Sequence, residues 1–106
     1  MIYLAVPYSH KNKNVRELRF EIANMVTAIL IRSGAIVYSP ISHTHPVDKY
    51  MKGDFGWVEF DFNFLKHCKK LVILRLPGWK ESEGIKREME YANNNNIKIE
   101  FIDLCA

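Results

Sequence analysis

The sequence is short of cysteine, of long apolar runs and of excess charge, and each shortage excludes a class of protein. Its two cysteines, Cys68 and Cys105, lie far apart with neither metal-binding nor redox spacing, so no disulfide framework is expected. No apolar run approaches the length that spans a membrane, and the start MIYLAVPYSH lacks the basic segment of a signal peptide. We therefore expect a cytoplasmic protein with no membrane partner.

The excess of positive charge is too small to predict nucleic-acid binding. A formal charge of +3 over 106 residues suits an anionic small molecule such as a nucleotide, but nucleic acid would need a clustered basic face. The local basic group Lys11, Lys13 and Arg16 is interpreted as a solvated loop in preference to an anion site. A small-molecule partner is expected, and a nucleic-acid partner is not.

Glycine is missing where a dinucleotide-binding fold needs it. The first apolar run is followed by Val6-Pro7-Tyr8 and not by a glycine-rich loop. The context of a nucleophile elbow is absent around Ser9, Ser39, Ser42 and Ser82. A Rossmann oxidoreductase and a serine hydrolase are both disfavoured, and no cofactor is expected.

The hydrophobic pattern predicts alternating strands and helices. Short apolar runs predict strands over residues 2–6, 35–38, 71–76 and 98–103. Helical spacing predicts helices over residues 15–32 and 54–68, the second capped near Asp54, and a third from an N-cap at Ser82 to the asparagines of 93–96. Two prolines predict a loop over residues 41–53.

This alternation predicts one α/β domain over residues 1–106. We expect a doubly wound, flavodoxin-like or Rossmann-like parallel sheet of four to five strands in the order 2-1-3-4, with helices on both faces. Ligands of such sheets bind beyond the carboxyl ends of the strands at the switch point. That rule places residues 7–9, 43–45 and 79–82 around one crevice.

Glu88 interrupts an apolar helical stripe. Ile85, Met89 and Ala92 share one face of the predicted third helix, and Glu88 lies on that same face. A buried, unpaired carboxylate costs several kcal/mol, so Glu88 needs a partner, a route to water or a chemical role.

Asp61 repeats the pattern on the helix before the strand at 71–76. A carboxylate from each flanking helix, directed at the crevice, could work as a pair, because one can attack an anomeric carbon while a second group manages the proton of the leaving group. In the other interpretation each acid is paired with a lysine or solvated at the edge of its stripe. Spacing alone favours this second interpretation.

His43 and His45 have the alternation of a metal-binding strand, but the segment reads as a loop and no third ligand is evident. We expect both histidines to line the crevice as structural or substrate-contacting groups, and no metal.

Three segments carry a resemblance to a known family. They are IYLAVPYS, FDFNFLKHCKKLVIL and LPGWKESEGIKREMEYA, and the likeness that they carry extends over nearly the whole chain. The last is the most specific, with a serine, a glycine and then a glutamate four residues after that glycine, on a helix that follows a buried strand. The chain resembles the nucleoside 2-deoxyribosyltransferase superfamily, and within it the small bacterial and phage proteins of unassigned function.

The resemblance implies cleavage or transfer at the N-glycosidic bond of 2′-deoxynucleosides or their 5′-monophosphates. Glu88 would attack C1′, Asp61 would orient it or assist departure of the base, and Tyr8 would hold Glu88 by a hydrogen bond. Ser82 and nearby backbone amides would meet a 5′-hydroxyl or phosphate at the helix N-terminus. The expected substrate-binding residues are Ser9, His43, His45, Trp79, Ser82 and Gly84.

Three positions depart from the family pattern. Val6 replaces a glycine, Lys69 stands where an acidic group is frequent, and Glu83 beside Ser82 would repel a phosphate dianion. Two alternatives to an enzyme therefore remain: a nucleotide-binding module of the same fold without turnover, and a structural or interaction protein.

The helix predicted over residues 54–68 carries more aromatic surface than one side of a thin sheet can bury. Such an excess commonly marks an interface. Together with the resemblance, it predicts a homodimer or higher homo-oligomer.

Overall fold

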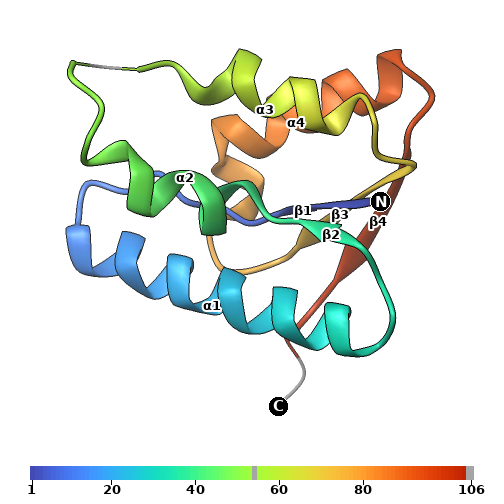
Figure 1. Cartoon of the computed structure of the whole chain (residues 1–106), viewed down its shortest axis with the longest axis horizontal. Coiled ribbons are helices and arrows are strands. Elements are labelled where there is room, and N and C mark those ends of the chain that lie inside the picture. The colour runs from blue at the N-terminus through green and yellow to red at the C-terminus, as the bar shows by residue number, and fades with distance from the viewer. Residues whose placement is uncertain (54, 105–106) are drawn as a thin grey trace.

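Four parallel strands form the centre of the molecule in the computed structural model, which describes residues 1–53 and 55–104 (Figure 1). The strands are β1 (Ile2–Ala5), β2 (Val37–Tyr38), β3 (Lys70–Leu74) and β4 (Lys98–Ile102). Their order is β2-β1-β3-β4, so the predicted doubly wound sheet is confirmed with four strands. No helix within the described residues is long and apolar enough to cross a membrane.

Helices cover both faces of this sheet. They are α1 (Lys13–Arg32), α2 (Pro40–Asp48), α3 (Trp57–Leu65) and α4 (Glu83–Asn94), with a short 3-10 turn, η1 (Trp79–Glu81), before α4. Figure 1 shows α1 on one side of the strands and α3 and α4 on the other. Alternate strand residues point to opposite faces, so Tyr3 and Ile73 pack with α3 and α4 while Leu4 and Val72 pack with α1 and α2.

The predicted loop over residues 41–53 is wrong, because Pro40 to Asp48 form the helix α2. Pro40 occupies the first turn, where its missing N–H costs no hydrogen bond. Pro46 lies inside the helix, yet the helix ends two residues later, so little regular structure remains to be broken. Burial of Pro40 and Ile41 stabilises a helix that local propensity disfavours.

The aromatic helix is shorter than predicted, and its rings pack within the chain. It begins at Trp57 after an N-cap at Gly56, and the expected cap at Asp54 lies outside the described residues. Phe64 stacks on Tyr38 at a centroid distance of 4.1 Å, and Phe62 stacks on Tyr91 at 4.5 Å. These intramolecular contacts account for much of the aromatic surface, so α3 supplies little basis for an interface.

Exposed apolar side chains gather instead on α1. Leu18, Met25 and Ile29 share one helical face and are 60%, 63% and 61% exposed. Glu21 and Arg32, about three turns apart beside this face, would meet if two copies of α1 packed antiparallel about a two-fold axis. We propose that a second copy of the chain covers this face.

Met25→Glu should therefore convert the protein to a monomer, because a charge would be buried at the centre of the apolar contact. Light scattering at micromolar concentration measures this change. Ile31→Glu introduces the same charge on α1 away from the apolar face and should leave the mass unchanged. A wild-type protein that is strictly monomeric would contradict the proposal.

Candidate active site

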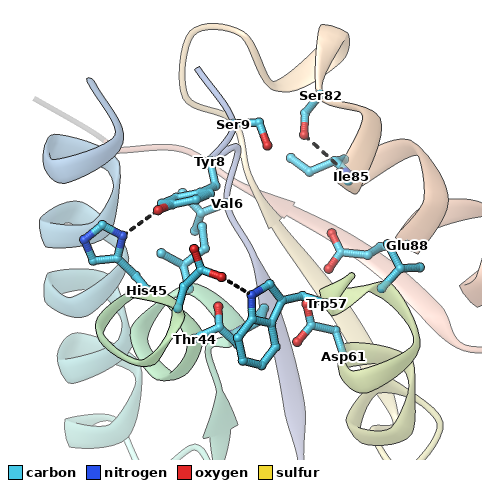
Figure 2. A pocket seen from close by; sticks show the side chains of 15 residues that line it. Val6, Tyr8, Ser9, Thr44, His45, Trp57, Asp61, Ser82, Ile85 and Glu88 are labelled. Atoms are coloured by element: carbon cyan, nitrogen blue, oxygen red, sulfur yellow. Dashed lines mark hydrogen bonds between the residues drawn. The ribbon is translucent and has the colours of Figure 1, made fainter. Parts of the chain in front are cut away.

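A cavity of about 250 Å³ opens at the carboxyl end of β1, where the switch point of the sheet was predicted (Figure 2). Its volume lies just below the usual range for small-molecule sites, about 300–1,000 Å³. Its polar lining comes from the segment after β1, from α2, from α3 and from the start of α4, and comprises Tyr8, Ser9, Thr44, His45, Asp48, Trp57, Asp61, Ser82 and Glu88.

Glu88 extends from α4 into the cavity, and a side chain of strand β1 fixes its carboxylate. The hydroxyl of Tyr3 donates a hydrogen bond to Glu88 Oε2 over 2.5 Å. Tyr3 is fully buried on β1, so this bond satisfies a phenol that is removed from water and holds one oxygen of the half-buried Glu88 carboxylate. The prediction that Tyr8 holds Glu88 is wrong, because Tyr3 does so.

Asp61 faces Glu88 from α3 across one end of the cavity (Figure 2). Its Oδ1 is buried and has no hydrogen-bond partner among residues 1–53 and 55–104. Burial raises the pKa of Asp61 to about 7. An unpartnered, desolvated carboxyl beside a cavity is costly for folding, which favours a chemical role for this group.

Both carboxyls of this pair hold protons more tightly than free side chains do. The pKa of Glu88 is raised to about 8, mainly by burial and further by the charge of Asp61, while the hydrogen bond from Tyr3 opposes the rise. Because the two groups repel each other when both are ionised, their protons leave in coupled steps. Near neutral pH the pair therefore shares a proton, and Glu88 gains its full negative charge as the pH rises through about 8.

Tyr8 and His45 line the opposite wall of the cavity. The Tyr8 hydroxyl lies 2.5 Å from His45 Nδ1, and His45 Nε2 lies 2.8 Å from Glu17 Oε1 on α1. The ring of Phe20 packs on the imidazole at a centroid distance of 4.2 Å. The predicted place of His45 in the crevice is confirmed.

His43 and Trp79 do not line the cavity, contrary to prediction. Two positions apart on a helix, His43 and His45 point to nearly opposite sides, so α2 can direct only one of them inward. His43 instead lies beside Tyr38, with its Nδ1 3.2 Å from the tyrosine hydroxyl. The turn η1 directs Trp79 toward β4, where it packs on Phe101 at a centroid distance of 5.5 Å.

Ser82, Ser9 and Gly84 line the cavity as expected. Ser82 caps α4, and its Oγ accepts a hydrogen bond from the Ile85 N–H over 3.2 Å. The first turn of α4 therefore lies at the cavity wall next to Ser9 (Figure 2).

Trp57 and Asp48 belong to the site but were not predicted as such. The indole Nε1–H of Trp57 donates to Asp48 Oδ1 over 2.7 Å, which joins the start of α3 to the end of α2. This bond fixes the indole as a wall of the cavity (Figure 2). Asp48 was not predicted because its segment was interpreted as a loop. Trp57 was not predicted because the aromatic side chains of its helix were assigned to an interface.

Three positions differ from the sequence pattern of nucleoside 2-deoxyribosyltransferases, and the structure shows where each one lies. Val6 is buried and lines the cavity, so its side chain narrows the end of β1. Lys69 is exposed and immediately precedes β3. The carboxylate of Glu83 lies 3.6 Å from Lys86 Nζ, an ion pair that partly offsets its charge at the start of α4.

Comparison with known families gives one match. The family model described as "Domain of unknown function (DUF1937)" matches residues 1–103. No curated protein matches the sequence.

Proposed function

We infer the function of this chain, which belongs to the DUF1937 family, from the chemistry of its cavity. The proposed activity is cleavage or transfer at the N-glycosidic bond of 2′-deoxynucleosides or their 5′-monophosphates. The observation that carries it is the pair of Glu88 and Asp61, which face one nucleoside-sized cavity from two helices, with Glu88 fixed by Tyr3. The resemblance of the surrounding sequence to nucleoside 2-deoxyribosyltransferases supports the same chemistry.

In this reaction ionised Glu88 attacks C1′ of the sugar. A bond forms between a carboxylate oxygen and C1′ while the bond from C1′ to the base nitrogen breaks, and the electron pair leaves with the base. Tyr3 holds the attacking carboxylate in one orientation, which removes part of the entropy cost of reaching the transition state. Attack on the sugar–enzyme ester by water gives hydrolysis, and attack by a second base gives transfer.

The remaining walls suit the other parts of a nucleoside. The indole of Trp57 offers a flat apolar surface on which a base or sugar can stack. The first turn of α4, with Ser82 and Gly84, offers polar groups to the 5′ end of the sugar.

Asp61→Asn should lower kcat by about a hundredfold, because the neutral amide can neither exchange a proton nor influence the pKa of Glu88 through its charge. Removing the Asp61 charge removes one cause of the raised pKa of Glu88, so that pKa should fall. The acid limb of the pH–rate profile should then move to lower pH. An unchanged rate and an unchanged acid limb would show that Asp61 has no part in the reaction.

The direct test is a panel of deoxynucleosides and their monophosphates, analysed by chromatography for released base. Release of base, by hydrolysis or in the presence of a second base, supports the enzyme. A binding module is the second candidate, favoured by the pKa of about 8, which leaves much of Glu88 protonated at neutral pH. Thermal stabilisation by panel members without base release would favour that module. If no panel member is cleaved and none stabilises the protein, an interaction protein is favoured.

A further inference from the structure

A chain of three hydrogen-bonded side chains connects the cavity with the protein surface. It runs from the Tyr8 hydroxyl through His45 to the carboxylate of Glu17, with distances of 2.5 Å and 2.8 Å. The side chain of His45 is 17% exposed and that of Glu17 is 48% exposed, so the outer end of the chain meets solvent. Phenol, imidazole and carboxylate are all groups that can pass or accept a proton.

The chain lies on the wall opposite the nucleophile. Figure 2 shows Tyr8 and His45 across the cavity from Glu88 and Asp61. In a displacement at C1′, the nucleophile and the departing base occupy opposite sides of the carbon, as in other glycosidic cleavages. A base attacked from the side of Glu88 therefore departs toward Tyr8.

We propose that Tyr8, His45 and Glu17 form a proton relay that protonates the departing base and later deprotonates the second nucleophile. The proposal rests on the proposed function and adds a proton donor on the side of the base. Tyr8 would touch the base and be catalytic, whereas His45 and Glu17 would act through it.

The first proton transfer starts from protonated His45. Its Nε2–H donates to Glu17 and its Nδ1–H donates to the Tyr8 oxygen, while the Tyr8 hydroxyl donates to the base nitrogen. As the bond from C1′ to the base breaks, the Tyr8 proton moves to the base and the His45 Nδ1 proton moves to Tyr8. The base leaves with its proton, Tyr8 is again a phenol, and His45 is neutral.

The second half reverses these movements. Water attacks C1′, the bond from C1′ to Glu88 breaks, and Glu88 leaves as a carboxylate. One water proton passes to the Tyr8 oxygen while the Tyr8 proton passes to His45 Nδ1, which restores the imidazolium. Atoms and charge balance over the two halves, with no further reactant than water or a second base.

The charges around the relay fit this cycle. Glu17 on α1 accepts the outer hydrogen bond of the relay, and Asp48 on α2 and Arg16 on α1 lie near enough to influence Tyr8. Burial raises the pKa of Tyr8 above its ordinary value, so the phenol keeps a proton between transfers. Among residues 1–53 and 55–104, Asp61 and Glu88 are the titratable groups that line the cavity opposite the relay.

The test compares bases that need a proton with bases that do not. 2′-Deoxyguanosine needs protonation of its base, whereas 7-methyl-2′-deoxyguanosine releases a neutral base without it. Tyr8→Phe and His45→Gln should lower the rate of base release in a single turnover by about a hundredfold or more on the first substrate and less than about threefold on the second. Single-turnover measurement isolates this step from breakdown of the sugar–enzyme ester, which needs the relay for both substrates. Glu17→Gln keeps a hydrogen-bond acceptor and should cost about tenfold on the first substrate alone.

Two controls separate a relay from a structural role. The variant with both Tyr8→Phe and His45→Gln should be no slower than the slower single variant, because the residues act as one unit. Tyr38 and His43 form a second tyrosine–histidine pair outside the cavity, so Tyr38→Phe should leave both rates unchanged. Should the panel show a preference for pyrimidines, 2′-deoxyuridine and 5-fluoro-2′-deoxyuridine give a weaker form of the same comparison, because fluorine stabilises the departing base as an anion.

The outcomes distinguish the relay from the proposed function. Equal losses on both substrates, in variants that melt like the wild type, would overturn the relay and leave the function intact. Cleavage of only the activated substrate by the wild type would also overturn it. If the wild type cleaves no member of the panel and neither substrate, the proposed function fails and the relay with it.

Discussion

Glu88→Gln should abolish release of base, lowering kcat by about 10⁴-fold or more, because an amide oxygen is a poor nucleophile. The glutamine keeps the shape of the side chain and can still accept the hydrogen bond from Tyr3. Folding should therefore survive, which separates loss of chemistry from loss of structure. Chromatography of the nucleoside panel measures the rate, and circular dichroism checks the fold.

Glu90→Gln is the matched control, since Glu90 lies on the same helix but is exposed outside the cavity. It should leave the rate unchanged. A 2-fluoro-2-deoxynucleoside slows breakdown of the sugar–enzyme ester, so mass spectrometry should detect a sugar adduct on Glu88 in the wild type. Base release that persists in Glu88→Gln would show that another group is the nucleophile.

The same pair of acids should make the protein less stable as the pH rises from about 5 to 8. Burial raises the pKa of Asp61 from 3.8 to about 7 and that of Glu88 from 4.5 to about 8, so in this range the folded state binds more protons than the unfolded state. The free energy of unfolding therefore falls with rising pH. Each rise corresponds to roughly 4 to 5 kcal/mol, and coupling between the groups makes the two contributions non-additive.

Urea unfolding at pH 5 and pH 8 measures this loss. The variant with both Glu88→Gln and Asp61→Asn should match the wild type at pH 5 and exceed it by several kcal/mol at pH 8, because its amides remain neutral. Glu90→Gln should keep the wild-type dependence on pH. Parallel curves for the wild type and the double variant would mean that the two carboxyls are not buried at a cost.

Local pattern was enough to predict the sheet, because each buried strand is a short apolar run and each long helix shows helical spacing. It was not enough for α2, where burial of Pro40 and Ile41 stabilises a helix that contains Pro46. The error had a further effect on the site. Once residues 43–45 were read as a loop, nothing indicated that His43 and His45 would point to opposite sides.

The acids of the site could be found from sequence because each interrupts an apolar stripe on its own helix. Tyr3 could not be found this way, since a tyrosine in a buried strand looks like any other apolar residue. The available signal was its hydroxyl, which must find a partner when buried. Glu17 gave no signal, because an acid on a long helix is ordinary until the fold brings it to His45.

The hydrogen bond between Tyr3 and Glu88 joins positions 85 residues apart in the chain. Closing so long a loop is entropically unfavourable, and parallel strands add further pairings between distant segments. Refolding should therefore be slow for a chain of this size, and the nucleophile should reach its final orientation only when the whole sheet has formed. In stopped-flow refolding, recovery of the active site should coincide with the last folding phase, and no shorter fragment that lacks β1 should position Glu88.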